Sequence, residues 1–292
     1  MVVGLLMVAA GSAAGAFGAL LGLGGGVLIV PVLTFGFGLP LREAVGVSLV
    51  CVIMTSSAAA GVYLERHVAN LRLGMSLELF TAIGALIGGS IAFLIDERLI
   101  ALLFAVVMAY LAVSMLRAGR GAKEPVAEDG AIVEDGDAPD APDPAHVAVA
   151  AVAPVDTSTF LDELSGPGYQ VRNLGRGVVG ATGAGVISAL LGVGGGIVKV
   201  PLMHLAMGVP LKVATATSNL MVGITAAASA VIYLLRGQID PYVAGPTALG
   251  VFVGATVASR LAHRVDARWL RMLFVLVLAY TAIQMLIKAI NG

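Results

Sequence analysis

The chain has 292 residues, of which 59% are hydrophobic and 12% are charged. Soluble domains carry about 25% charged residues, so this composition excludes an ordinary soluble protein and predicts an integral membrane protein. The one cysteine, Cys51, excludes an internal disulfide framework and a cysteine-based metal site, and the four histidines lack metal-ligand spacing. We therefore expect no cofactor and no metal.

Ten apolar segments follow one another along the chain, in two sets of five. The first set lies at about 2–21, 26–38, 43–64, 73–95 and 99–117. The second set lies at about 176–191, 197–208, 213–235, 242–262 and 269–289. No basic residue precedes the first segment, which is also longer than the apolar core of a signal peptide, so we expect it to stay in the membrane.

An acidic segment separates the two sets. Residues 121–166 hold 11 of the 18 acidic residues and a single basic one, Lys123, which leaves 16 basic and 7 acidic residues elsewhere. Its composition, rich in Ala, Pro, Asp and Glu, cannot bury enough apolar surface to fold alone. The sequence therefore predicts a first membrane repeat at 1–118, a disordered cytoplasmic linker at 119–173 and a second membrane repeat at 174–292.

The two sets match each other at a constant spacing of 170 residues. The matched pairs include Pro31 and Pro201, Pro40 and Pro210, Ser48 and Ser218, Thr55 and Thr225, Tyr63 and Tyr233, and Arg66 and Arg236. A shared preference for Ala, Val and Leu does not produce matches of these residue types. The sequence therefore predicts an internal duplication.

The basic residues indicate how the two repeats are oriented, because cytoplasmic loops of membrane proteins are enriched in Lys and Arg. In an inverted arrangement, 12 basic residues fall on the linker side, and the other side holds Arg42, Arg98, Arg236 and Lys288. In a parallel arrangement the same residues divide 9 against 7. We therefore predict inverted repeats, with the linker in the cytoplasm and both termini on the periplasmic side.

A glycine-rich stretch lies between the first and second apolar segments of each repeat. It reads Gly22-Leu23-Gly24-Gly25-Gly26 and then Gly192-Val193-Gly194-Gly195-Gly196, and each glycine costs a helix about 1 kcal/mol relative to Ala. The arm that follows has only 12–13 residues, whereas a full span needs about 20. We expect V-shaped helical hairpins whose tips meet near the membrane midplane, the pattern that points to a transporter's binding site.

Such tips suit a small anion, because the first N–H groups of a helix have no intrahelical partner and glycine allows close approach. Lys199 adds a cation in the first turn after the second tip; the alternative is that it pairs with a carboxylate such as Glu78. Nearby hydroxyl and amide side chains suit oxyanion recognition, or else form hydrogen bonds between helices. The candidate substrate-binding residues are Gly24, Gly25, Gly26, Gly194, Gly195, Gly196, Lys199, Ser48, Ser218, Asn219 and Thr217.

Two other side chains have alternative interpretations. Glu78 is a candidate for proton coupling, although an interfacial position fits equally well. Cys51 lies three residues after Ser48 and is a candidate for substrate proximity, although a lone membrane cysteine is usually inert. Glycine pairs at a spacing of four predict close helix packing; they are Gly11 and Gly15, Gly84 and Gly88, and Gly250 and Gly254.

The doubled glycine motif, each copy followed by a proline, resembles the TauE/SafE family of anion exporters, as do Gly38-Leu39-Pro40-Leu41 and Gly208-Val209-Pro210-Leu211. The resemblance covers about 1–118 and 175–290 but not the linker. It implies export of sulfite, sulfoacetate or another small sulfur-containing or organic anion across the bacterial inner membrane. It also implies that the proton gradient drives this export.

The residues and the resemblance together predict a secondary transporter that works by alternating access, with sulfite as the first substrate choice. Alternatives are an exporter of sulfoacetate or another small organic anion, a passive anion channel, or a membrane scaffold without transport. We expect no enzyme, because the sequence offers no constellation of nucleophile, base and metal ligands. The expected partners are the anion and the lipid bilayer, without nucleic acid, and the oligomeric state is not predicted.

Overall fold

The computed structural model describes residues 2–20, 26–65, 69–121, 165, 170–261 and 267–291, and regular secondary structure within these ranges is entirely helical. The first repeat contains α1 (Val2–Leu20), α2 (Gly26–Pro31), η1 (Val32–Gly36), α3 (Leu41–Glu65), α4 (Leu71–Ile91) and α5 (Glu97–Gly121). The second contains α7 (Leu174–Leu191), α8 (Gly196–Pro201), η3 (Leu202–Ala206), α9 (Leu211–Leu235), α10 (Pro241–Leu261) and α11 (Ala267–Asn291). The predicted apolar segments are thus confirmed as helices. The predicted disordered linker lies almost wholly outside the described residues.

Seven of the described helices are long and apolar enough to cross a membrane, which confirms the prediction of an all-helical membrane protein. Two apolar helices are shorter, Gly26–Gly36 and Gly196–Ala206. Each contains a proline, Pro31 or Pro201, directly before a π-helical turn. Proline lacks an N–H group and its ring clashes with the carbonyl one turn earlier, which explains the wider turn at this point.

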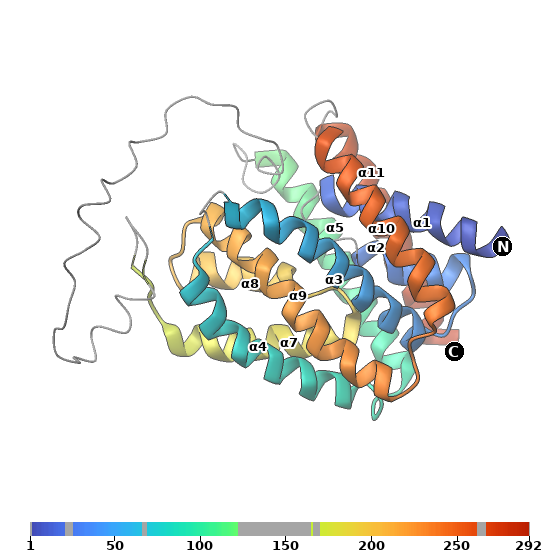
Figure 1. Cartoon of the computed structure of the whole chain (residues 1–292), viewed down its shortest axis with the longest axis horizontal. Helices are drawn as coiled ribbons and strands as arrows, with labels where there is room; N and C mark the ends of the chain where they lie inside the picture. Colours follow the sequence, from blue (N-terminus) through green and yellow to red (C-terminus); the bar gives the residue numbers. More distant parts are fainter. Residues whose placement is uncertain are drawn as a thin grey trace.

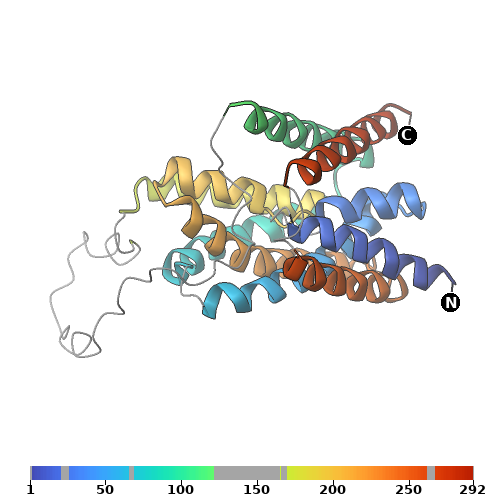
Figure 2. The ribbon, with the colours of Figure 1, turned by 90° about the horizontal axis from the view of Figure 1, so that it is seen from above.

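The helices of the two repeats interleave (Figure 1). The first long helix of each repeat packs on the fourth segment of the other, so that α1 contacts α10 and α7 contacts α4. Equivalent helices also contact each other, α3 with α9 and α5 with α11, and further contacts join α4 with α9 and α3 with α10. In Figure 2 the α5–α11 pair, green and dark red, lies at one edge of the helical bundle. The core between the repeats is therefore built from both of them.

Glycines allow the closest of these helix contacts. A Cβ atom added to Gly84 on α4 would collide with the carbonyl oxygen of Thr182 on α7, and one added to Gly254 on α10 would collide with that of Ser12 on α1. The collision is with backbone, which cannot move as a side chain can. The prediction that the spaced glycines serve helix packing is confirmed.

The second glycine break forms a hairpin. Gly195, just after the break, lies beside Ser188, because a Cβ added to it would be 3.1 Å from the Ser188 Cβ. Further along the returning arm, Met207 packs against Gly177, and its carbonyl oxygen accepts a 3.0 Å hydrogen bond from the Arg172 N–H. The arm therefore runs back along α7 to its beginning. The hairpin shape agrees with the prediction, while the orientation of the repeats across the membrane stays a prediction.

Candidate functional site

The two glycine tips touch each other. Ser48, on α3, donates its hydroxyl hydrogen toward the carbonyl oxygens of Gly26 (3.0 Å) and Gly192 (2.7 Å). A Cβ added to Gly26 would lie only 2.8 Å from the Gly192 oxygen, so the approach requires glycine. One buried hydroxyl thus joins the beginning of α2 to the second hairpin. Gly24 and Gly25 lie outside the described residues.

The backbone of the second tip adopts a conformation that favours glycine. Gly192, Gly194 and Gly195 have φ angles of +67°, +80° and +74°, in the left-handed region where other residues are strained. The Gly195 carbonyl accepts hydrogen bonds from the N–H groups of Val198 and Lys199. The N–H groups that precede these two in the helix have no helical acceptor. They form a set of donors at the tip.

Two buried hydroxyl groups flank this tip without a hydrogen-bond partner among the described residues: Ser188 Oγ on α7 and Ser218 Oγ on α9. A Cβ added to Gly195 would lie 3.5 Å from the first, and one added to Gly196 would lie 3.6 Å from the second. Buried polar atoms are rarely left without partners. The pair therefore indicates a place for a ligand that accepts hydrogen bonds.

A cavity of about 220 Å³ lies beside the same tip. Its wall includes Val107 and Tyr110 of α5 together with Ser188, Gly195 and Pro201 of the second hairpin. By a comparable measure a single water molecule needs about 10–15 Å³. The cavity is large enough for a small anion, but most of the side chains that line it are apolar, and Ser188 is one of its few polar residues.

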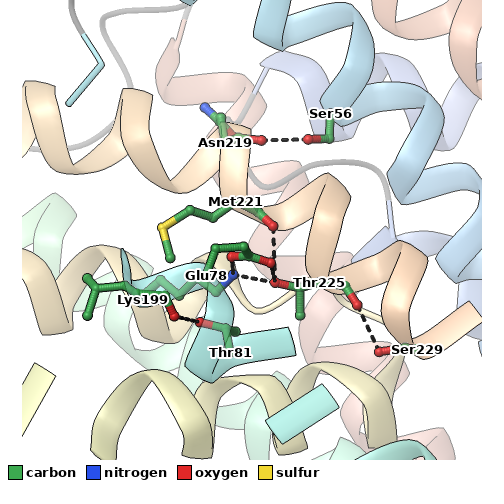
Figure 3. Close-up of polar contacts among 9 residues, drawn as sticks. Ser56, Glu78, Thr81, Lys199, Asn219, Met221, Thr225 and Ser229 are labelled. Carbon is green, nitrogen blue, oxygen red and sulfur yellow. Dashed lines mark hydrogen bonds and ion pairs between the residues drawn. The ribbon is translucent and has the colours of Figure 1, made fainter. Parts of the chain in front are cut away.

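A buried ion pair lies on the other side of the arm (Figure 3). Lys199 of α8 and Glu78 of α4 are 1% and 4% exposed, and the Lys199 Nζ is 3.0 Å from the Glu78 Oε2. Thr225 of α9 closes a ring, accepting from Lys199 Nζ at 2.5 Å and donating to Glu78 Oε1 at 2.6 Å. Of the two interpretations of Lys199, the structure therefore shows the pairing with Glu78. Glu78 is buried within the protein, while its depth in the membrane stays a prediction.

The remaining predicted residues lie apart from this arrangement or have other partners. The Thr217 hydroxyl accepts a 3.0 Å hydrogen bond from the Asn70 N–H, at the beginning of α4. The backbone carbonyl oxygen of Asn219 accepts a 2.5 Å hydrogen bond from the Ser56 hydroxyl. Cys51 is fully buried in the apolar core. The structure thus assembles Ser48, Ser218 and the described glycines at the tips, but it places Thr217 at the α3–α4 turn.

Ser188 was not predicted from the sequence as a site residue. Its equivalent in the first repeat is Gly18, so the comparison of repeats gives it no matching hydroxyl. The sequence signal that could have identified Ser188 is its spacing from the glycine stretch. It lies four residues before Gly192, and helical residues four apart share one face.

The comparisons with known proteins agree with this architecture. The family described as Sulfite exporter TauE/SafE matches residues 7–285. A protein of Bacillus subtilis (strain 168), described as probable membrane transporter protein YunE, is 23% identical over 293 residues, which cover 98% of each chain. No solved structure matches the chain significantly. Because the family match includes both repeats and both hairpins, this chain is a membrane transporter that belongs to the TauE/SafE sulfite exporter family.

Proposed function

We propose that this protein is a secondary transporter that exports a small sulfur oxyanion, with sulfite as the first choice, from the bacterial cytoplasm by alternating access. One observation carries the proposal. The glycine tips of the two repeats meet at Ser48, and beside them the buried hydroxyls of Ser188 and Ser218 have no partner among the described residues. The family supports the substrate class and the direction of transport.

The chemistry of the second tip matches an oxyanion. Serine hydroxyls and free N–H groups donate hydrogen bonds, and sulfite offers only oxygen acceptors. The helix Gly196–Ala206 begins at this tip, and the partial positive charge of a helix start favours an anion. We propose that the anion binds at Gly194, Gly195 and Gly196 and next to Ser218. Gly24, Gly25 and Gly26 would complete the site from the first hairpin.

Alternating access follows from the origin of the two tips. Each tip belongs to a different repeat, so a rocking motion of one repeat against the other changes the side from which the anion is reached. An inverted orientation is supported by the hairpin at Gly192–Gly196, which makes the number of passes in the second repeat odd, and by the distribution of basic residues. We place the linker in the cytoplasm and both termini in the periplasm.

The orientation is tested with single cysteines in a Cys51→Ala background. A membrane-impermeant thiol reagent applied to intact cells with a permeabilised outer membrane should label Tyr242→Cys, which replaces an 88% exposed side chain in the first turn of α10. The same reagent should label Ser158→Cys in the linker only after the inner membrane is opened. Labelling of Ser158→Cys in sealed cells would overturn the inverted orientation.

Transport is tested with purified protein in liposomes. A transporter exchanges labelled sulfite faster when unlabelled sulfite is present on the opposite side, whereas a channel shows no such acceleration. In detergent, sulfite, sulfoacetate, sulfate and chloride are compared for the thermal stabilisation that each confers. Stabilisation by sulfite with accelerated exchange supports the proposal, and the absence of both contradicts it.

A double variant tests the location of the site. Ser188→Ala/Ser218→Ala should fold normally, because neither hydroxyl has a partner to lose among the described residues. Its affinity for sulfite should fall by about 10- to 100-fold, since a hydrogen bond to a charged group contributes about 1.5–3 kcal/mol. Ser229→Ala is the control, because this buried hydroxyl bonds the Thr225 carbonyl within its own helix. Equal affinities of all three proteins would place the site elsewhere.

A further inference from the structure

We infer that Lys199 changes its counter-ion during transport: Glu78 neutralises it in the empty site, and the anion neutralises it in the loaded site, where Glu78 has bound one proton. This inference rests on the proposed anion transport. It names the residues that couple proton binding to anion binding. It also predicts the stoichiometry: the protein takes up one proton from solvent for each anion that it binds.

The geometry leaves Lys199 able to accept a second anionic partner. A lysine ammonium group has three N–H donors, and two of them serve Glu78 and Thr225. The third has no acceptor in the part of the chain that the structure describes. One donor is therefore available without breaking the existing contacts.

The ammonium group also lies close to the second glycine tip. On α9, Val222 precedes Thr225 by three residues, which is a rise of about 4.5 Å and a little less than one helical turn. Val222 contacts the tip, since a Cβ added to Gly194 would lie 2.6 Å from its Cγ1. Helical side chains lean toward the helix N-terminus, and the N-terminus of α8 is the tip itself. A small shift of the Lys199 side chain along α8 thus brings its charge toward a bound anion.

Charge balance links this shift to a proton. The Lys199–Glu78 pair is neutral as a unit, and both side chains are almost fully buried. An anion added beside it leaves an excess negative charge in the membrane interior, where unpaired charge is costly. A proton on the Glu78 carboxylate removes that excess. The protonated carboxyl group retains acceptor capacity for the Thr225 hydroxyl, so the ring around Thr225 survives.

The positions related to this pair by the internal duplication do not carry charges. Lys199, Glu78 and Thr225 correspond to Ile29, Ala248 and Thr55 at the spacing of 170 residues. Ile29 and Ala248 are buried and apolar, and the Thr55 hydroxyl bonds only the Val52 carbonyl of its own helix. The duplicated positions are therefore apolar in one copy of the arrangement and charged in the other.

No other titratable group among the described residues contacts this pair. Glu78 on α4 faces α7, α8 and α9. The other charged or titratable side chains described on these elements and on η3 are Arg72, Arg176, His204 and Tyr233. The first three are exposed, and the Tyr233 hydroxyl donates to the Ala189 carbonyl. The side chain of Lys212 lies outside the described residues. Glu78 is thus the group that titrates in answer to the anion.

The ratio of one proton per anion determines the net charge that crosses the membrane in each transport cycle. A singly charged anion and its proton cross as a neutral unit. A doubly charged oxyanion with one proton crosses as one net negative charge, which an inside-negative membrane potential drives outward. Export of doubly charged sulfite with one proton is therefore driven by the membrane potential. An inward proton gradient opposes the exported proton, so the counter-ion exchange differs from the expectation that the proton gradient drives export.

The experiment counts protons bound by wild-type protein when it binds an anion. Calorimetry in two buffers with different ionisation enthalpies gives the number, from about pH 6 to about pH 9. The probe is methanesulfonate, whose charge is constant in this range, with sulfite in parallel. We expect about one proton per anion, and an affinity that falls about tenfold per pH unit on the alkaline side.

Glu78→Gln imitates the protonated carboxyl group. It should bind the anion with an affinity independent of pH and without proton uptake, and its difference from wild type corrects for protons carried by sulfite itself. Glu43→Gln, the same chemical change on α3, is the control and should keep the wild-type pH dependence. If Glu78→Gln fails to fold, the number of protons that wild-type protein takes up with methanesulfonate still tests the counter-ion exchange.

The outcomes separate this inference from the proposed function. Anion binding without proton uptake, at constant affinity across the pH range, overturns the counter-ion exchange and leaves anion transport in place. Failure of wild-type protein to bind any anion at any pH overturns both. Proton uptake that disappears in Glu78→Gln supports both.

Discussion

Equivalent positions in the two repeats have the same backbone setting but different chemistry. Ser48 in the first repeat is fully used, because its hydroxyl joins the two glycine tips. Its counterpart Ser218 is equally buried and has no partner among the described residues. Ile29 in the first hairpin is apolar, whereas its counterpart Lys199 is charged and paired.

This difference shows that equivalent residues of the two repeats have different roles. The first copy supplies a hydroxyl that maintains the junction and an apolar arm that packs. The second copy supplies the hydroxyls of Ser188 and Ser218 and the Lys199 ammonium group, while the paired carboxylate, Glu78, comes from α4 of the first copy. A symmetric fold therefore contains an asymmetric site, centred on the second hairpin. Substitutions that make one repeat resemble the other test this division directly.

The largest effect is expected when the buried ion pair is split. Glu78→Ala leaves the Lys199 charge without a partner, so the free energy of unfolding should fall by about 3–5 kcal/mol. The double variant Lys199→Ile/Glu78→Ala copies the residues at the duplicated positions, Ile29 and Ala248, and should recover most of that stability. Thermal unfolding in detergent measures both. A double variant as unstable as the single one would show that the pairing is not what stabilises these two side chains.

An intermediate effect separates the two equivalent serines. Ser48→Ala removes the hydroxyl between the Gly26 and Gly192 carbonyls and should lower the free energy of unfolding by about 1–3 kcal/mol. Ser218→Ala should change it by about 0.5 kcal/mol or less while weakening sulfite binding about tenfold. Unfolding curves and sulfite titrations of the two variants give the comparison. Equal effects of the two substitutions would contradict the division of roles.

The smallest effect is expected at Cys51, whose counterpart in the second repeat is Met221. Both side chains are buried in apolar cores, so the thiol should react with alkylating reagents only after unfolding. Cys51→Ala should cost about 1 kcal/mol or less and leave sulfite affinity unchanged. Protection of the thiol by sulfite, or a changed affinity, would restore the hypothesis that Cys51 lies near the substrate.

Much of the fold could be predicted because the same helix-breaking residues occur at equivalent positions of the two repeats. Matched prolines and glycines mark the hairpins, and glycines at a spacing of four mark the helix contacts. Both signals are local, since a run of glycines disfavours a helix whatever surrounds it. The short second arms and the two irregular turns after Pro31 and Pro201 follow from the same local chemistry.

The site was harder to predict because its members come from distant parts of the chain. Glu78 lies 121 residues from Lys199, and the sequence leaves open whether they meet. Thr217 and Ser218 are neighbours, yet neighbouring helical residues point about 100° apart. One therefore faces the α3–α4 turn and the other the glycine tip. Ser188 has no hydroxyl counterpart in the first repeat, so symmetry could not reveal it.

The interleaving of the repeats also has a consequence for biogenesis. The glycine face of α1 fits only against α10, which the ribosome makes more than two hundred residues later. The early helices must therefore wait in the lipid, inserted but unassembled, until the last ones arrive. Maturation is then limited by completion of the chain rather than by insertion of its first half. Two half-chains made separately in one cell should find each other and form the same bundle.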